Sequence, residues 1–186
     1  MKYDKFYLRK QFLSKRKEKY FKSNKFNFNL LFELINKHFK KKITIAGYYP
    51  SNHEVDILPF LQKALKKKIK TVLPVIKSST AMDFKTWAFN EPLYVNKFGI
   101  LEPDVLNKKV KPDFILVPLV AFDNELNRIG YGKGYYDRIL KKIKNEKKII
   151  SLGVAYSFQR CKNIPTNRHD FRLDYIFTEQ GIISSK

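Results

Sequence analysis

The sequence contains one cysteine and no long apolar segment. Cys161 has no second cysteine with which to form an intramolecular disulfide, so the fold cannot depend on such a bond. No apolar run approaches the roughly 20 residues that a membrane-spanning helix requires, and the N-terminus lacks the apolar core of a signal peptide. We therefore expect a soluble, cytoplasmic protein that has no membrane partner.

Acidic residues are also scarce, with 17 against 38 basic residues and a net charge of +21. Such a balance is typical of proteins that bind nucleic acid or anionic membranes. Here, however, the lysines are spread along the whole chain and far outnumber the seven arginines, whereas specific nucleic-acid sites concentrate arginine and exposed aromatic residues. We expect solvated lysine faces and no specific nucleic-acid partner, although the positive field can attract polyanionic small molecules.

The chain is long enough for one domain with a sizeable core. Its 186 residues are 44% hydrophobic and 15% aromatic, which excludes a disordered polyelectrolyte, and they show no compositional break or internal repeat. We expect a single domain over residues 1–186, with N-terminal helices in residues 1–42 and an α/β core in residues 43–186.

The N-terminal region carries two helical patterns. Phe6, Leu13 and Tyr20 recur every seven residues, which predicts a first helix over residues 3–21 with these side chains on its apolar face. Apolar residues at spacings of three and four from Phe28 to Phe39 predict a second helix that ends in the lysines at 40–42.

The rest of the chain alternates between strand and helix patterns. Residues 43–49 and 70–76 are short apolar segments on either side of an amphipathic helix that begins near Pro59, which together predict a right-handed βαβ unit. Further strands are expected at 113–117, 149–156 and 173–178, and a helix at 136–143; residues 78–103 have no clear pattern. We therefore expect an open, mostly parallel α/β sheet with helices on both faces and ligands beyond the carboxyl ends of its strands.

A glycine-rich segment lies between an expected central strand and an expected helix. Gly130, Gly132 and Gly134 permit positive φ, so that backbone N–H groups can form an anion-binding concavity at a helix N-terminus. Lys133 adds positive charge, and Asp137 in the first helical turn could bind Mg²⁺. Alternate glycines alone also suit a flexible turn. The spacing matches neither a Walker loop nor a dinucleotide fingerprint.

The residues around these glycines make the pattern more specific. Phe122, Asp123, Arg128 and the string Gly134-Tyr135-Tyr136-Asp137 complete a motif that resembles the signature of 5-formyltetrahydrofolate cyclo-ligases. Weaker resemblances run along the chain, at Lys5 and Arg9, Tyr49, residues 54–56, 73–75, 82–84 and 102–103, Gln159, and His169–Asp170. The family often has a glycine between Asp123 and Arg128, and its absence here points to a local difference in that turn.

The resemblance implies an activity and a fold. Members of the family are ATP-dependent ligases that convert 5-formyltetrahydrofolate, with Mg²⁺, to 5,10-methenyltetrahydrofolate, ADP and phosphate in folate one-carbon metabolism. The resemblance also implies a three-layer α/β/α fold and a monomer, with a folate that can be polyglutamylated as the small-molecule substrate.

The resemblance also assigns roles to individual residues. It places ATP at Lys5, Arg9, Arg128, Ile129, Gly130, Tyr131, Gly132, Lys133, Gly134, Tyr135 and Tyr136. It places the folate at Tyr49, Glu54, Phe84, Trp87 and Tyr135, and the metal at Asp137 and Asp170. Structural alternatives stay open: a solvated basic face for Lys5, a helix-terminus charge for Glu54 or Asp137, a turn cap for Asp170, and core packing for the aromatic residues.

Two other functions remain possible from the sequence. A nucleotide-binding regulatory protein would keep the loop without turnover. A basic RNA-associated protein would lose RNA affinity steeply with salt and would be insensitive to Asp137→Asn.

Overall fold

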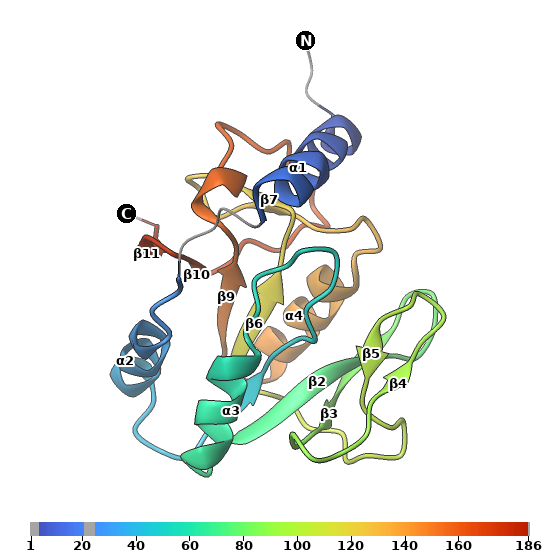
Figure 1. Cartoon of the computed structure of the whole chain (residues 1–186), viewed down its shortest axis with the longest axis vertical. Helices are drawn as coiled ribbons and strands as arrows, with labels where there is room; N and C mark the ends of the chain where they lie inside the picture. The colour runs from blue at the N-terminus through green and yellow to red at the C-terminus, as the bar shows by residue number, and fades with distance from the viewer. Residues whose placement is uncertain (1–3, 21–24, 186) are drawn as a thin grey trace.

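The centre of the molecule is a seven-stranded, mostly parallel sheet. The computed structural model describes residues 4–20 and 25–185. The sheet has the order β11-β10-β9-β6-β1-β2-β3, in which β3 and β11 run antiparallel to their neighbours at the two edges (Figure 1). Its strands are β1 Thr44–Ala46, β2 Lys70–Ile76, β3 Met82–Thr86, β6 Phe114–Pro118, β9 Ile150–Val154, β10 Tyr175–Thr178 and β11 Gly181–Ser184. The mostly parallel sheet expected from the alternating pattern is confirmed.

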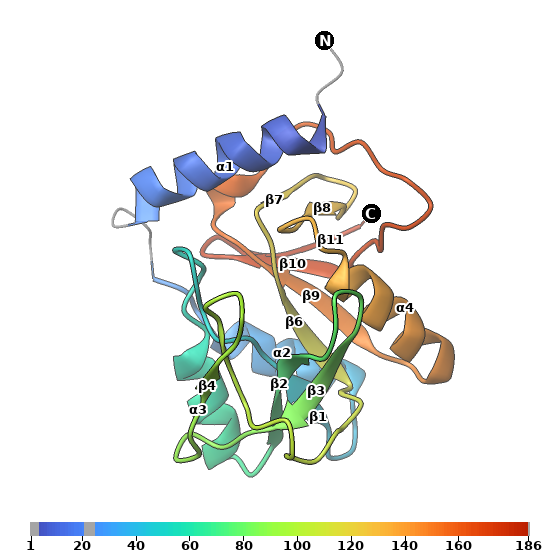
Figure 2. The same cartoon turned by 90° about the vertical axis from the view of Figure 1, so that its right-hand side faces the viewer.

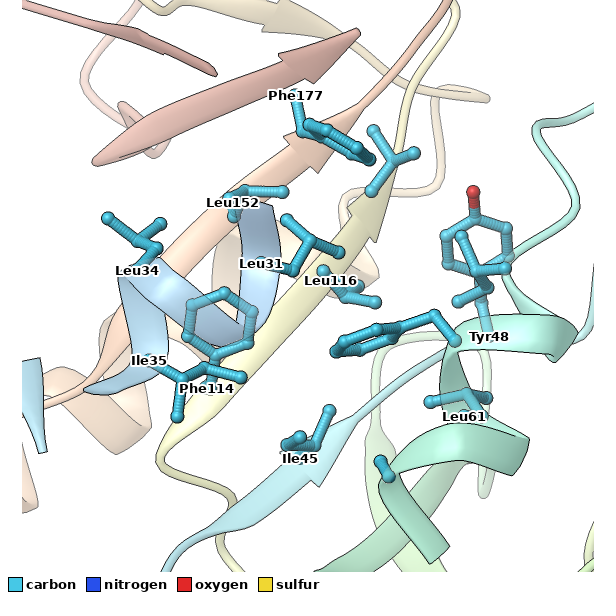
Figure 3. Close-up of a cluster of buried hydrophobic side chains, with 14 of the residues drawn as sticks. Leu31, Leu34, Ile35, Ile45, Tyr48, Leu61, Phe114, Leu116, Leu152 and Phe177 are labelled. Atoms are coloured by element: carbon cyan, nitrogen blue, oxygen red, sulfur yellow. The ribbon is translucent and has the colours of Figure 1, made fainter. Parts of the chain in front are cut away.

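Helices cover both faces of this sheet. Helices α2 (Asn29–His38) and α3 (Leu58–Lys66) lie on one side and α4 (Tyr135–Glu146) on the other (Figure 2). Strand β6 is buried on both faces: Phe114 and Leu116 pack in the cluster with α2 and α3, whereas Ile115 and Val117 pack in the cluster with α4. Figure 3 shows part of the first cluster, in which side chains of α2 and α3 pack against side chains of the sheet. The three-layer α/β/α fold is therefore confirmed.

The βαβ unit also forms as expected. Strands β1 and β2 pair in parallel on either side of α3, and Pro59 lies in the first turn of that helix, where its missing N–H costs no helical hydrogen bond. Asp56 Oδ1 accepts a hydrogen bond of 2.9 Å from Leu58 N and so satisfies one of the free N–H groups at the helix start.

The first helix, α1 (Lys5–Lys19), forms, but its expected apolar face is only partly correct: Leu13 and Tyr20 pack against core clusters, whereas Phe6 does not. Phe6 is 61% exposed, and the buried residues are Leu8, Phe12 and Arg16. This side of α1 packs on a two-stranded hairpin, β7 (Ala121–Phe122) and β8 (Arg128–Ile129), beyond the sheet (Figure 2). The seven-residue spacing did not identify this buried face because one of its three residues, Arg16, is charged, and hydrophobic periodicity considers apolar residues only. Tyr3 and Phe21, the ends of the expected helix, lie outside the described residues.

Residues 78–103, which had no clear pattern, form the edge strand β3 and a small hairpin of β4 (Tyr94–Val95) and β5 (Leu101–Glu102). Glu102 Oε2 accepts hydrogen bonds from Ile76 N at 3.1 Å and from Asn96 Nδ2 at 2.8 Å, and so ties this hairpin to the end of β2. No helix within the described residues is long and apolar enough to cross a bilayer.

The turn from Asp123 to Arg128, where the family often has a glycine, is built without one. Asp123 organises it: Oδ1 accepts from the backbone N–H groups of Glu125 and Asn127, each at 3.0 Å. Leu126 takes the left-handed conformation, with φ of 63°, and its side chain is fully buried against α4. A residue that is normally glycine in such a turn is thus used here as part of the core.

The left-handed conformation of Leu126 should reverse the usual order of stability of alanine and glycine variants. A non-glycine residue in the left-handed region costs about 1 kcal/mol, so Leu126→Gly should be more stable than Leu126→Ala by about that amount. At Leu140, which is equally buried on α4, the alanine variant should instead be the more stable by about 1 kcal/mol. Urea unfolding of the four variants measures both differences. The same order at both positions would contradict the role of backbone strain at Leu126.

Candidate active site

The glycine-rich segment forms a loop between β8 and the start of α4. Gly132 and Gly134 have positive φ of 92° and 66°, and Gly134 is the N-cap of α4. Gly130 keeps a negative φ and leaves space beside its Cα. The positive φ that the glycines permit is therefore used at two of them, at the N-terminus of α4, and the binding of an anion there stays a prediction.

Helix α1 contributes two basic side chains to this loop. Arg9 Nε donates a hydrogen bond of 2.7 Å to Gly130 O, and its guanidinium lies so close to Gly132 that a Cβ there would be 3.3 Å from Arg9 Cζ. Lys5 Nζ forms a 2.5 Å ion pair with Asp170 Oδ2. The two residues of the predicted i, i+4 pair thus have different partners: Arg9 contacts the loop, and Lys5 contacts the proposed metal residue Asp170.

Asp137 lies in the first turn of α4 and is bound by Arg128. Arg128 Nη2 donates to Asp137 Oδ1 at 2.6 Å, and its Nη1 donates to Phe171 O at 2.5 Å. Asp137 Oδ1 also accepts from Phe171 N at 3.1 Å. Burial lowers the pKa of Arg128, although the charge of Asp137 opposes that change. Arg128 is thus engaged inside the protein, where it orders Asp137 and the segment after Asp170; its direct contact with phosphate stays a prediction.

The two proposed metal residues, Asp137 and Asp170, flank the same short segment. Asp170 Oδ2 accepts from Lys5 Nζ and from Asn167 N, and Asp137 uses only Oδ1 for its hydrogen bonds within the described part of the chain. Burial alone would raise the pKa of Asp170, but the hydrogen bonds from Lys5 and Asn167 hold it below its usual value. Asp170 is therefore suited to remain charged.

This donor set fits Mg²⁺ bound together with a nucleotide. Residues 4–20 and 25–185 contain no group of three or more His, Cys, Asp or Glu side chains arranged to hold a metal. Mg²⁺ in nucleotide sites is commonly held by only one or two carboxylates, with phosphate and water completing the octahedron. Each of these aspartates retains a carboxylate oxygen that could serve as such a ligand.

Glu54 lies on the other side of the loop, in a turn after β1. Asn52 and His53 have positive φ of 46° and 61°, and Glu54 N donates to Ser51 O at 2.9 Å, which defines a type I′ turn. Glu54 Oε2 accepts from Ser51 N at 2.9 Å, and Oε1 accepts from the Tyr131 hydroxyl at 3.0 Å. Glu54 is 6% exposed, so its orientation is set by these contacts.

Sequence reasoning missed Arg16. It is 1% exposed on α1, donates from Nη1 to Leu119 O at 3.1 Å, and donates from Nη2 to the Tyr131 hydroxyl at 2.5 Å. Its Nε is buried and has no hydrogen-bond partner among residues 4–20 and 25–185. The available signal was the rarity of arginine in this lysine-rich chain, which drew attention to Arg9 and Arg128 but applied equally to Arg16.

The remaining candidate aromatic residues take different positions. Phe84 and Trp87 are buried in the two separate core clusters, which is the alternative that the sequence left open for them. The Tyr135 hydroxyl donates to Ser78 O at 3.0 Å, whereas the Tyr136 hydroxyl is buried without a hydrogen-bond partner in the structure. Tyr49 follows β1 and is half-buried.

Burial of Glu54 has a consequence for pH dependence. Burial raises the pKa of Glu54, against the opposing effect of the hydrogen bond from Ser51 and the charge of Arg16. The pKa of Glu54 is therefore higher in the folded protein than in the unfolded chain. Between these two pKa values, the contribution of Glu54 to the free energy of unfolding decreases as pH rises. Glu54→Gln should remove this contribution, so that the free energy of unfolding decreases less steeply above about pH 4. Urea unfolding across this pH range measures it.

The exposed α2 residue Glu33 offers a control. Glu33→Gln should retain the wild-type dependence of unfolding free energy on pH. An unchanged pH dependence in Glu54→Gln would show that the Glu54 carboxylate is not destabilised by its burial.

Comparison with known proteins agrees with this geometry. The fold is that of an α/β protein whose glycine loop lies beyond the carboxyl ends of parallel strands, where ligands bind in such folds. The chain belongs to the 5-formyltetrahydrofolate cyclo-ligase family, whose model matches residues 1–179, and the assignment as an enzyme of this family is confirmed. The likeness stated from the signature residues is therefore correct.

Individual relatives cover most of the chain. A 5-formyltetrahydrofolate cyclo-ligase from Mycoplasma pneumoniae is 34% identical over 95% of this chain and 99% of its own. One from Haemophilus influenzae is 35% identical over 69% of this chain and 72% of its own. The structure of a 5,10-methenyltetrahydrofolate synthetase from Aquifex aeolicus is similar with a TM-score of 0.74 and 34% identity, covering 97% of this chain and 92% of that one.

Proposed function

We propose that this enzyme converts 5-formyltetrahydrofolate and ATP, with Mg²⁺, to 5,10-methenyltetrahydrofolate, ADP and phosphate. Family membership supports the folate chemistry. The observation that carries the ATP requirement is the glycine loop with Arg9 bonded across it and Asp137 at the start of α4, since such loops are suited to phosphate groups. The protein would act as a cytoplasmic, single-domain monomer on a small-molecule substrate.

The proposed reaction has two steps. The formyl oxygen attacks the γ-phosphorus, so that an O–P bond forms and ADP leaves. N10 then attacks the activated formyl carbon and loses its proton, while the carbon–oxygen bond breaks and phosphate leaves. ATP thereby supplies the leaving group that a formyl oxygen lacks.

In this proposal the protein chiefly positions the ligands and neutralises charge. Lys5, Arg9 and the loop from Arg128 to Tyr136 would bind ATP, and Asp137 and Asp170 would hold Mg²⁺, which would neutralise charge on the transferred phosphoryl group. Glu54 and Tyr49 would bind the folate, with the Glu54 carboxylate accepting hydrogen bonds from the donor edge of the pterin. Phe84 and Trp87, which were also predicted at the folate, lie in the core clusters, and the proposal does not depend on contacts with them.

The test is a near-ultraviolet absorbance assay for methenyltetrahydrofolate formation from 5-formyltetrahydrofolate. A rise in absorbance that requires both ATP and Mg²⁺ is expected. Folded protein that binds ATP and forms no product would overturn the proposal in favour of the regulatory function that the sequence also allowed.

A further inference from the structure

Tyr131 joins the glycine loop to Glu54. Its backbone lies between Gly130, whose carbonyl is bonded to Arg9, and Gly132, over which the Arg9 guanidinium lies. Its hydroxyl reaches out of the loop to Glu54 Oε1 at 3.0 Å. A residue that belongs to the nucleotide loop by position thus contacts the proposed folate residue through its side chain.

Arg16 fixes the direction of this hydrogen bond. A guanidinium can only donate, so the Tyr131 hydroxyl must accept from Arg16 Nη2 and is left to donate its own proton to Glu54. The guanidinium carbon of Arg16 also lies 5.7 Å from the centre of the Tyr131 ring. Arg16 is itself held by the carbonyl of Leu119, just after β6. Arg16 therefore sets the direction of the hydrogen bond to Glu54, whereas Tyr131 itself belongs to the glycine loop and is 40% exposed.

Glu54 is held firmly from one side only. Ser51 N and its hydroxyl contact Oε2 from within the same turn, whereas Oε1 depends on Tyr131. Two consecutive residues with positive φ, Asn52 and His53, precede Glu54, and neither is glycine. Such a backbone costs free energy and persists where surrounding contacts hold it. The Tyr131 hydroxyl supplies such a contact from a different element.

We propose that Tyr131, held by Arg16, is a positioning residue through which nucleotide binding at the loop and folate binding at Glu54 strengthen each other. A nucleotide that orders the loop also orders Tyr131 and hence Oε1 of Glu54, so that the folate loses less free energy in ordering the site. Thermodynamic linkage requires the reverse effect to be equal. The inference rests on the proposed function, because it takes both ligands from it.

Calorimetric titration of 5-formyltetrahydrofolate, with and without saturating Mg²⁺ and β,γ-imido-ATP, measures this coupling. In the wild-type protein the nucleotide analogue should tighten folate binding by about tenfold, within the usual range for coupled sites. Tyr131→Phe should bring that factor close to one. The coupling factor is the ratio of the folate affinities with and without the saturating analogue, so a change in the affinity for either ligand alone does not enter it.

Two further variants sharpen the test. Tyr94→Phe removes a hydroxyl from an exposed tyrosine on β4 and should keep the wild-type coupling. Arg16→Lys keeps the charge but has one ammonium group in place of the two amino groups that bond Leu119 and Tyr131. It should weaken the coupling in the wild-type background. In the Tyr131→Phe background it should cause no further change in the coupling.

The outcomes separate the two proposals. Wild-type coupling that survives in Tyr131→Phe, or a wild-type factor near one, would overturn the positioning role while leaving the reaction in place. An independent effect of Arg16→Lys in the Tyr131→Phe background would overturn the connection through Arg16. A wild-type protein that does not bind 5-formyltetrahydrofolate at all would overturn the proposed function itself.

Discussion

Replacing Gly132 by valine should reduce turnover by about 100-fold or more and leave the fold near intact, because displacing a positioning group by about 1 Å can cost that much. Gly132 has φ of 92°, a conformation that a β-branched residue adopts only with strain. A Cβ would also lie 3.3 Å from Arg9 Cζ and 3.4 Å from its Nη2, so the guanidinium would have to shift. The change thus disturbs both the backbone N–H directions and the basic side chain beside them.

Gly99→Val provides the matched control for this change. Gly99 is also exposed with a positive φ, of 73°, in the turn between β4 and β5, and no atom lies within 4 Å of where its Cβ would be. The two variants should therefore have similar unfolding free energies, whereas only Gly132→Val should lose activity in the absorbance assay. Wild-type activity in Gly132→Val would refute the assignment of this loop to phosphate binding.

Asp137→Asn should also lower turnover by about 100-fold or more, because the asparagine keeps the shape of the side chain but removes the charge that a metal ion needs. The remaining Oδ1 can still accept from Arg128 and from Phe171 N, which separates the effect of charge from that of folding. The activity of the variant should also require a higher Mg²⁺ concentration.

Asp137→Ala should abolish turnover as well. It should also lower the free energy of unfolding by about 1–3 kcal/mol, because it leaves the buried Arg128 without its carboxylate partner.

Asp174→Asn is the control for Asp137→Asn. The Asp174 side chain is 28% exposed against 27% for Asp137; it also accepts from a backbone N–H, that of Ser151, and lies 3.5 Å from a basic group, Lys144 Nζ. It lies where β10 begins, at the amino ends of the strands, so its substitution should leave turnover and Mg²⁺ dependence unchanged. Equal losses of activity in the two variants would show that general destabilisation, and not a metal site, explains the effect at Asp137.

The signature motif was predictive because it is local. Gly132, Gly134 and Asp137 lie within six consecutive residues, and the structure places them at one helix N-terminus, as the spacing indicated. The i, i+4 spacing of Lys5 and Arg9 likewise predicted that both would face the same way. Each of these relations depends on backbone geometry over one or two helical turns, which is available from sequence.

Other parts of the site depended on contacts between distant segments. The hydrogen bonds of Tyr131 join α1, the loop and the turn after β1, whose residues lie 115 and 77 positions apart in the sequence. The spacing of Phe84 and Trp87 in the sequence could not distinguish a ligand-facing wall from core packing. In the structure Phe84, on β3, lies in the cluster with α4, and Trp87, directly after β3, lies in the cluster with α2 and α3.

By itself, the sequence determined the α/β alternation, the parallel βαβ unit and the position of the loop before α4, because these follow from hydrophobic periodicity and from local backbone preferences. Only the tertiary structure decided which face of α1 is buried, that Arg128 is engaged by Asp137 and Phe171, and that Arg16 reaches Glu54 through Tyr131. The physical reason is that burial allows an arginine to replace a hydrophobic residue when its donors find partners, and those partners come from segments that periodicity cannot bring together.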